Sequence, residues 1–326
     1  MWRGRFLVSV RVSVSVRVRV GVSVGTGHLS KTFGGAATTL RGMRKTDERS
    51  PMTRNTTHGA ITTPSPLRRG DYGIDGDFRK VSPRGQFAIA ASIVTGLAAL
   101  TVVLGTVVGA PALSLATGVL AVAVALIVAS YIHTTRVGKF VVWSRVLGEL
   151  RLLGDEQVLD LGCGRGALLT MVAELLPNGR AVGIDLWHPD QTGNSPEATL
   201  RNAELEGVAD RIEVRTGDVT RLPFADDSFD LVISNLVLHN IPSAAARRDA
   251  IDEAVRVLRP GGRIVIGDLL HTNRYRARLL ELGVTDVSRR DVGWHMWWGA
   301  PFFPTRLVSG WNRSAAIVAR SVHADS

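Results

Sequence analysis

Cysteine is almost absent from this chain, which has only Cys163 among its 326 residues. A single cysteine excludes an intrachain disulfide and any cysteine-rich metal site. The eight histidines include no HxxxH or similar ligand spacing, so we expect no metal. Cys163 itself lies in a glycine-rich turn, where a small residue fits; a reactive thiol is the alternative interpretation.

Most of the chain has no excess of positive or negative charge. The formal net charge is +10, but residues 1–86 carry 16 Lys and Arg against 5 Asp and Glu, whereas residues 87–326 carry 23 against 24. A neutral region lacks the basic surface with which proteins bind nucleic-acid phosphates. Nucleic acid is therefore not an expected partner.

Charged residues are missing altogether from residues 87–132, a run of 46 positions. Residues 87–109 and 112–132 each exceed the ~20 apolar residues that cross a bilayer. Two transmembrane helices are expected; a buried hairpin in a soluble domain is the alternative. Basic residues flank both outer ends, namely Arg79, Lys80 and Arg84 before the run and Arg136, Lys139 and Arg145 after it. The positive-inside rule then predicts a two-pass membrane protein with both termini, and the domain that follows, in the cytoplasm.

The first 86 residues form a basic, low-complexity segment. Residues 8–25 alternate valine with arginine or serine, which is either a strand pattern or a translated repeat upstream of the true start, with Met43 and Met52 as alternative starts. Residues 26–86 are rich in Gly, Thr, Ser, Pro and Arg, a composition that cannot form a core. We expect 1–86 to be a disordered tail and 133–156 to be a linker with an amphipathic helix.

The remaining residues, 157–326, alternate apolar strands with helices. Strands are expected at 157–161, 180–186, 211–218, 229–235 and 262–269, and helices at 167–176, 196–206 and 243–258. Such alternation predicts a parallel sheet with helices on both faces. Two further strands without an intervening helix follow residue 284. The expected fold class is α/β, a doubly wound, seven-stranded, mostly parallel sheet preceded by the transmembrane hairpin.

The segment VLDLGCGRG leads from the first of these strands into a glycine loop of the kind that binds nucleotides. Gly162, Gly164 and Ala167 satisfy the loose dinucleotide pattern GxGxx(G/A), and Asp185 follows the loop at a distance that suits an acid on a ribose. Asp160 argues against a dinucleotide, because a carboxylate at the strand tip would repel a pyrophosphate. It suits a ligand with a cationic amino group. An NAD-dependent oxidoreductase is the weaker interpretation.

Four motifs then occur in order: VLDLGCGRG, GIDLW, GDVTRLPFADDSFDLVISNLVLHNI and VLRPGGRIVI. Together, over residues 138–312, they resemble the class I S-adenosylmethionine-dependent methyltransferases, and most nearly the ubiquinone/menaquinone C-methyltransferase type. The resemblance implies S-adenosylmethionine as the cofactor. The residues that it implies for binding the cofactor are Asp160, Gly162, Gly164, Gly166, Asp185, Leu186, Asp218, Val219 and Asn235.

The resemblance also gives roles to these residues. Asp160 would lie near the amino group of the methionine part, while Asp185 would accept hydrogen bonds from the ribose hydroxyls. Asp218 would bind the adenine amino group, and Asn235 would line the site near the sulfonium. The longer polar insertion WHPDQTGNSPEAT departs from the quinone-type pattern, so the acceptor is not carried over.

Residues near the acceptor can also be suggested. His239 follows the fourth strand and is the candidate general base, needed only if the acceptor must lose a proton; a hydrogen-bonded loop histidine is the alternative. The aromatic run WHMWWGAPFFP either packs the last strands or lines an apolar pocket. The candidate pocket residues are Trp143, Trp297, Trp298 and Phe302.

The function expected from the sequence is methyl transfer from S-adenosylmethionine to a small, lipophilic acceptor at the cytoplasmic membrane face. The alternatives are a membrane sensor or scaffold that binds the cofactor without turnover, and an NAD-dependent oxidoreductase.

Overall fold

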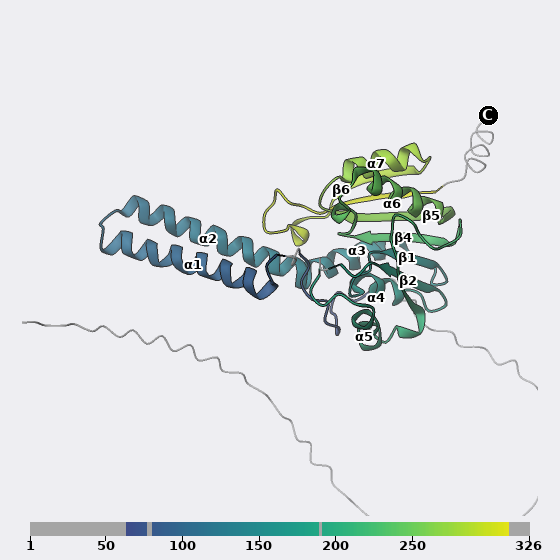
Figure 1. Ribbon diagram of the computed structural model, residues 1–326, viewed down its shortest axis with the longest axis horizontal. Helices are drawn as coiled ribbons and strands as arrows, with labels where there is room; N and C mark the ends of the chain where they lie inside the picture. The colour runs from purple at the N-terminus through teal and green to yellow at the C-terminus, as the bar shows by residue number, and fades with distance from the viewer. Residues whose placement is uncertain (1–62, 77–79, 189–190, 313–326) are drawn as a thin grey trace, which may run out of the picture. The chain divides into compact units, whose positions relative to one another are not determined.

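The structure is a computed structural model that describes residues 63–76, 80–188 and 191–312. Two long apolar helices form a hairpin that precedes the sheet in the chain. α1 (Pro83–Thr106) begins after Ser82, whose hydroxyl accepts a hydrogen bond from the Gly85 amide. α2 (Pro111–His133) begins with proline at its first position, where no amide hydrogen is needed. Both helices are long and apolar enough to cross a membrane, and 6% of each apolar stretch is buried (Figure 1).

The seven strands form one sheet. They are β1 (Gln157–Leu161), β2 (Arg180–Asp185), β3 (Ile212–Thr216), β4 (Phe229–Asn235), β5 (Leu258–Asp268), β6 (Thr285–Asp291) and β7 (Arg306–Trp311), in the order β3-β2-β1-β4-β5-β7-β6. The first five are parallel, and β7 runs antiparallel to both β5 and β6. The predicted doubly wound sheet with an antiparallel pair at one edge is confirmed.

Helices cover both faces of the sheet (Figure 1). α3 (Lys139–Leu150), α4 (Ala167–Ala173) and α5 (Pro196–Glu206) pack on one face, whereas α6 (Ala244–Arg256) and α7 (Thr272–Glu281) pack on the other. Neighbouring residues of β1 show the two sides of the sheet. Val158 packs in the hydrophobic cluster under α3, α4 and α5, whereas Leu159 packs in the cluster under α6 and α7, because successive strand residues point to opposite faces. Ser195 and Ser243 cap α5 and α6, as their sequence positions predict.

The expected linker at 133–156 is instead part of the domain core. A π-helical turn (η1, Thr134–Gly138) joins α2 directly to α3. α3 is amphipathic, as expected, but its apolar face is covered: Trp143 is 2% exposed and Leu147 fully buried. The core that packs against the sheet therefore includes residues before 157, where the sequence places the start of the domain.

Part of the expected disordered tail is also ordered. Residues 63–76, here called the N-terminal strap, lie against α4 and α5. Arg68 forms ion pairs with Glu174 and with Glu206, the latter at 3.3 Å. Tyr72 is 5% exposed, and its hydroxyl lies 2.9 Å from Thr170 Oγ1. The prediction of disorder over 1–86 is wrong for the strap; residues 1–62 lie outside the described ones.

Candidate functional site

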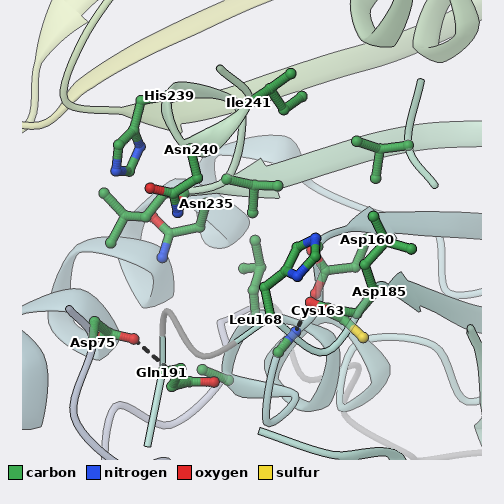
Figure 2. Close-up of a pocket in the computed structure, with 18 of the residues that line it drawn as sticks. Asp75, Asp160, Cys163, Leu168, Asp185, Gln191, Asn235, His239, Asn240 and Ile241 are labelled. Carbon is green, nitrogen blue, oxygen red and sulfur yellow. Dashed lines mark hydrogen bonds between the residues drawn. The ribbon is translucent and has the colours of Figure 1, made fainter. Parts of the chain in front are cut away.

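A cavity of about 660 Å³ lies where β1, β2 and β4 end. The strand order reverses here, since β1 lies between β2 and β4, and ligands of open α/β sheets bind at such a switch point. In Figure 2, Asp160, Cys163 and Asp185 gather at one end of this cavity, apart from His239 and Asn240. The cavity is thus long enough to bring two different groups of side chains to one ligand space.

The glycine loop after β1 forms the first wall. Gly162, Gly164 and Gly166 have φ of 69°, 51° and 80°, a conformation that strains other residues. A Cβ at Gly162 would lie 2.3 Å from Val237, so the loop also passes too close to its neighbour for a side chain. The Asp185 carboxylate holds the loop by accepting a hydrogen bond from the Gly164 amide at 2.8 Å. The loop therefore presents bare backbone to the cavity.

Two buried acceptors beside this loop have no donor. Asp160 is 1% exposed and lines the cavity, and its Oδ2 has no hydrogen-bond partner among the described residues. Burial, and then the charge of Asp185, raise the pKa of Asp160 well above its usual range. Asn235 Oδ1, at the end of β4, is likewise buried without a partner in the described chain. A ligand that donates hydrogen bonds, or carries positive charge, would satisfy both.

His239 and Asp268 form a hydrogen-bonded pair at the other end. His239 lies in the short helix η3 (Leu238–Asn240) and lines the cavity. Its Nδ1 is 2.5 Å from Oδ1 of the fully buried Asp268, whose Oδ2 accepts from the His239 amide at 3.0 Å and from Tyr275 Oη at 3.1 Å. The carboxylate fixes the ring orientation, and it favours the tautomer with the hydrogen on Nδ1, which leaves Nε2 as the basic atom.

The strap and the end of α2 form the remaining wall. Asp75 of the strap accepts a hydrogen bond from Lys139 Nζ at 2.8 Å. It also accepts one from Gln191 Nε2 at 2.9 Å, drawn as a dashed line in Figure 2. All three residues line the cavity. Tyr131 and Trp298 line it as well, with ring centroids 5.7 Å apart in an edge-to-face contact. The cavity thus extends from the glycine loop to the last turn of the apolar helix α2.

The chain is similar to known methyltransferases. A family model described as "Methyltransferase domain" matches residues 159–266. Arsenite methyltransferase of Halobacterium salinarum is 37% identical over 118 residues, which cover 36% of this chain and 28% of that protein. Demethylmenaquinone methyltransferase of Lactiplantibacillus plantarum is 34% identical over 122 residues, covering 37% of this chain and 48% of that protein. The chain thus spans less than half of the length of either relative. A S-adenosylmethionine-dependent methyltransferase from Aquifex aeolicus superimposes with a TM-score of 0.42 at 18% identity, over 52% of this chain and 88% of that one.

The matched segment covers the glycine loop and all or part of each of the five parallel strands, β1 to β5. The chain contains a class I S-adenosylmethionine-dependent methyltransferase domain. Its cofactor is S-adenosylmethionine, so the alternative interpretation as an NAD-dependent oxidoreductase is not supported.

The methyltransferase domain fits this cofactor in the chemistry of its cavity. S-adenosylmethionine carries an ammonium group and a sulfonium, and the cavity offers the unpartnered oxygens of Asp160 and Asn235. A buried acceptor is costly without a donor, and a cationic ligand removes that cost. Cys163 Sγ, by contrast, is buried against Gly183, and burial raises the pKa of its thiol well above its usual range.

The methyltransferase cavity contains most of the residues predicted from sequence. Those that line it are Asp160, Gly162, Gly164, Asp185, Leu186, Asp218, Val219, Asn235, His239 and Trp298. Gly166 lies just outside, where it precedes α4. Trp143 is in the core beside Gly267, Trp297 accepts hydrogen bonds from Ser130 and Thr134 through its carbonyl, and Phe302 is 78% exposed. These three aromatics, which the sequence suggests for the acceptor pocket, do not line this cavity.

Sequence reasoning missed the wall formed by Asp75, Tyr131, Lys139 and Gln191. The composition of the long window 26–86 hides the strap, although its segment GDYGID contains two acids and two apolar residues. Lys139 was counted among the basic residues that flank the membrane. It is 2% exposed and paired with Asp75, so it belongs to the site.

Proposed function

We propose that this protein transfers a methyl group from S-adenosylmethionine to a small, lipophilic acceptor at the cytoplasmic face of a membrane. The observation that carries the proposal is the extent of the cavity, which is lined by the glycine loop, by His239, and by Tyr131 at the end of α2. One space can therefore hold the cofactor, a proton acceptor and an apolar molecule that arrives along the hairpin.

The cofactor-binding residues act through charge and through backbone contact. The Asp160 carboxylate would accept from the ammonium group of the cofactor, and Asp185, which already orients the loop, has lone pairs left for the ribose hydroxyls. Asp218 and Val219 line the same cavity, and they would contact the adenine. Asn235 Oδ1 would face the sulfonium, since it is an unpartnered oxygen at the tip of the central strand β4.

The bound cofactor supplies an electrophilic methyl group on a positively charged sulfur. The protein aligns the acceptor with that methyl group, and such alignment alone can contribute ~7–11 kcal/mol. His239 Nε2 would take the proton that an acceptor hydroxyl or acidic C–H must lose as it bonds to the methyl carbon, while the electron pair of the broken carbon–sulfur bond would stay on the sulfur of the departing thioether. Asp268 stabilises the imidazolium that results, because its carboxylate already holds Nδ1. The proton stays on the histidine until solvent removes it.

The membrane-facing part of the proposal is supported by exposed apolar surface. α1 and α2 leave most of their apolar side chains uncovered, and soluble proteins rarely expose apolar patches of this extent. Basic residues stand at both outer ends, with Lys80 before α1, Arg84 in the first turn of α1, and Arg136 and Arg145 after α2. They favour a hairpin whose two ends, and the methyltransferase domain, are cytoplasmic.

The experiment that tests turnover uses purified full-length protein, S-adenosylmethionine with a labelled methyl group, and total extract of the producing cells. Acid-stable label on an extract component supports methyl transfer, and the Asp185→Ala variant, which should bind the cofactor more weakly, is the control in which labelling should fall. A protein that binds the cofactor by calorimetry but labels nothing in either membrane or soluble extract is a sensor or scaffold, which contradicts the proposal.

A further inference from the structure

A second cavity, of about 330 Å³, lies between α6 and α7, on the face of the sheet opposite to α3 and α4. Its walls are rich in arginine: Arg247 and Arg248 come from α6, and Arg274 and Arg278 from α7. Glu281 is the only carboxylate among the described residues that line it. The methyl-transfer chemistry above uses none of these side chains.

The positive charge of this cavity is only partly neutralised. Arg278 is paired with Asp252 at 2.6 Å and with Glu281 at 2.8 Å. Arg247, Arg248 and Arg274 form no ion pair within the described part of the chain. Three guanidinium groups that have no carboxylate partner therefore line one small cavity. Their field reaches His271, whose pKa is lowered first by burial and then by the charges of Arg247 and Arg274.

Arg247 shows that the charge is built into the fold. Its side chain is 8% exposed, and its Nη1 donates to the carbonyls of Ile241 and Pro242, the second at 3.2 Å. Its Nε, however, is buried and has no acceptor within the described residues. Burial of an unpaired charged donor is unfavourable, so an arginine held in this way points to a missing acceptor.

We propose that this cavity binds an anion of the phosphate class, a phosphomonoester or phosphodiester. The guanidinium fork of arginine matches two phosphate oxygens at once, and several arginines around one space are the usual means of holding such a group. The phosphate belongs either to a lipid headgroup or to a soluble molecule. Because Ile241 and Pro242 also line the first cavity, Arg247 connects the anion site with the loop that carries His239.

The test is a calorimetric titration of full-length protein with inorganic phosphate, in discs of neutral phosphatidylcholine. Arg248→Ala and Arg274→Ala remove exposed arginines that line the cavity, so the fold should survive. Each should weaken phosphate binding about tenfold, the effect of one charge-assisted hydrogen bond. Arg276→Ala is the matched control, since Arg276 is exposed on the same helix but does not line the cavity; its affinity should stay within about twofold.

Discs that contain phosphatidylglycerol distinguish the two sources of phosphate. A rise in the apparent Kd for inorganic phosphate means that the lipid headgroup competes for the cavity, whereas an unchanged Kd means that a soluble phosphate is the ligand; both support the site. Absence of saturable binding, or an equal loss in Arg276→Ala, would overturn it. Cofactor affinity, measured in the same samples, confirms that each variant is folded.

Discussion

His239 Nδ1 lies 2.5 Å from the Oδ1 atom of Asp268, a carboxylate that is fully buried. Because Nδ1 is held by the Asp268 carboxylate, Nε2 is the ring nitrogen of His239 that is available as a base. We expect His239→Ala to lower kcat by about 10²–10⁴-fold, the usual contribution of a general base, with the Kd for S-adenosylmethionine unchanged. Asp268→Asn should lower kcat in the same direction, while Tyr275→Phe removes one hydrogen bond to Asp268 and serves as the milder control. An undiminished kcat in His239→Ala would mean that the acceptor needs no base.

Asp185 should contribute to cofactor affinity in two ways, by binding the ribose and by holding the Gly164 amide. Asp185→Ala should weaken cofactor binding by about 1.5–3 kcal/mol for each charge-assisted hydrogen bond lost. Asp185→Asn keeps an oxygen for the loop and should weaken binding less. Calorimetry on folded variants measures both. Equal affinity in wild type and Asp185→Ala would remove the ribose role.

Asp160 should affect stability and binding in opposite directions. Its pKa is raised in the folded protein, first by burial, so the ligand-free protein loses stability as the pH rises from the ordinary carboxyl range through that raised pKa. The Asp160→Asn variant has no carboxyl group at this position, so its stability should not fall with rising pH for this reason. We expect it to unfold at a higher temperature than wild type at pH 8, with the difference vanishing as the pH falls toward about 4. Its affinity for the cofactor should fall by about 10–100-fold, because the amide has no charge to offer the ammonium group. A variant that is both less stable and equally tight in binding would contradict this role.

Two N-terminal deletions that differ only in the strap should have different effects on stability. Deletion of residues 1–62 should leave stability and cofactor affinity unchanged. Deletion of residues 1–76 removes Tyr72 from the core and leaves Lys139 and Glu206 without partners, which should cost about 3 kcal/mol or more. The midpoint temperature of thermal unfolding should therefore be lower than that of the full-length protein by roughly 6 °C or more for a domain of this size. Identical melting of the two truncated proteins would show that the strap contributes nothing.

Much of the fold was predictable because its signals are local. The apolar strands, the helices between them and the glycine loop each depend on residues that are close in sequence, and they form close to the predicted residues. The strap was not predictable in this way. Arg68 finds its partners at Glu174 and Glu206, over a hundred residues away, and no local composition reports such a contact.

The site was predictable to the same extent. Motif residues at strand ends, such as Asp160 and Asn235, converge because parallel strands end at one edge of a sheet. Trp143 was misassigned because an amphipathic helix buries its aromatic face equally well against a core or a ligand. Lys139 was misassigned because a lysine near a membrane helix usually faces the headgroups, whereas here Asp75 pairs with it inside the cavity.

The acceptor's chemistry is the central claim, and one measurement tests it most directly. Full-length protein in vesicles of native lipids is supplied with methyl-labelled S-adenosylmethionine and soluble extract, and the label is then partitioned between organic solvent and water. The label should enter the organic phase. Trp298→Ala should raise the KM for that acceptor without changing cofactor affinity, whereas Phe302→Ala, which alters an exposed ring outside the cavity, should behave as wild type. Label confined to water-soluble products, at equal rates in both variants, would contradict a lipophilic acceptor.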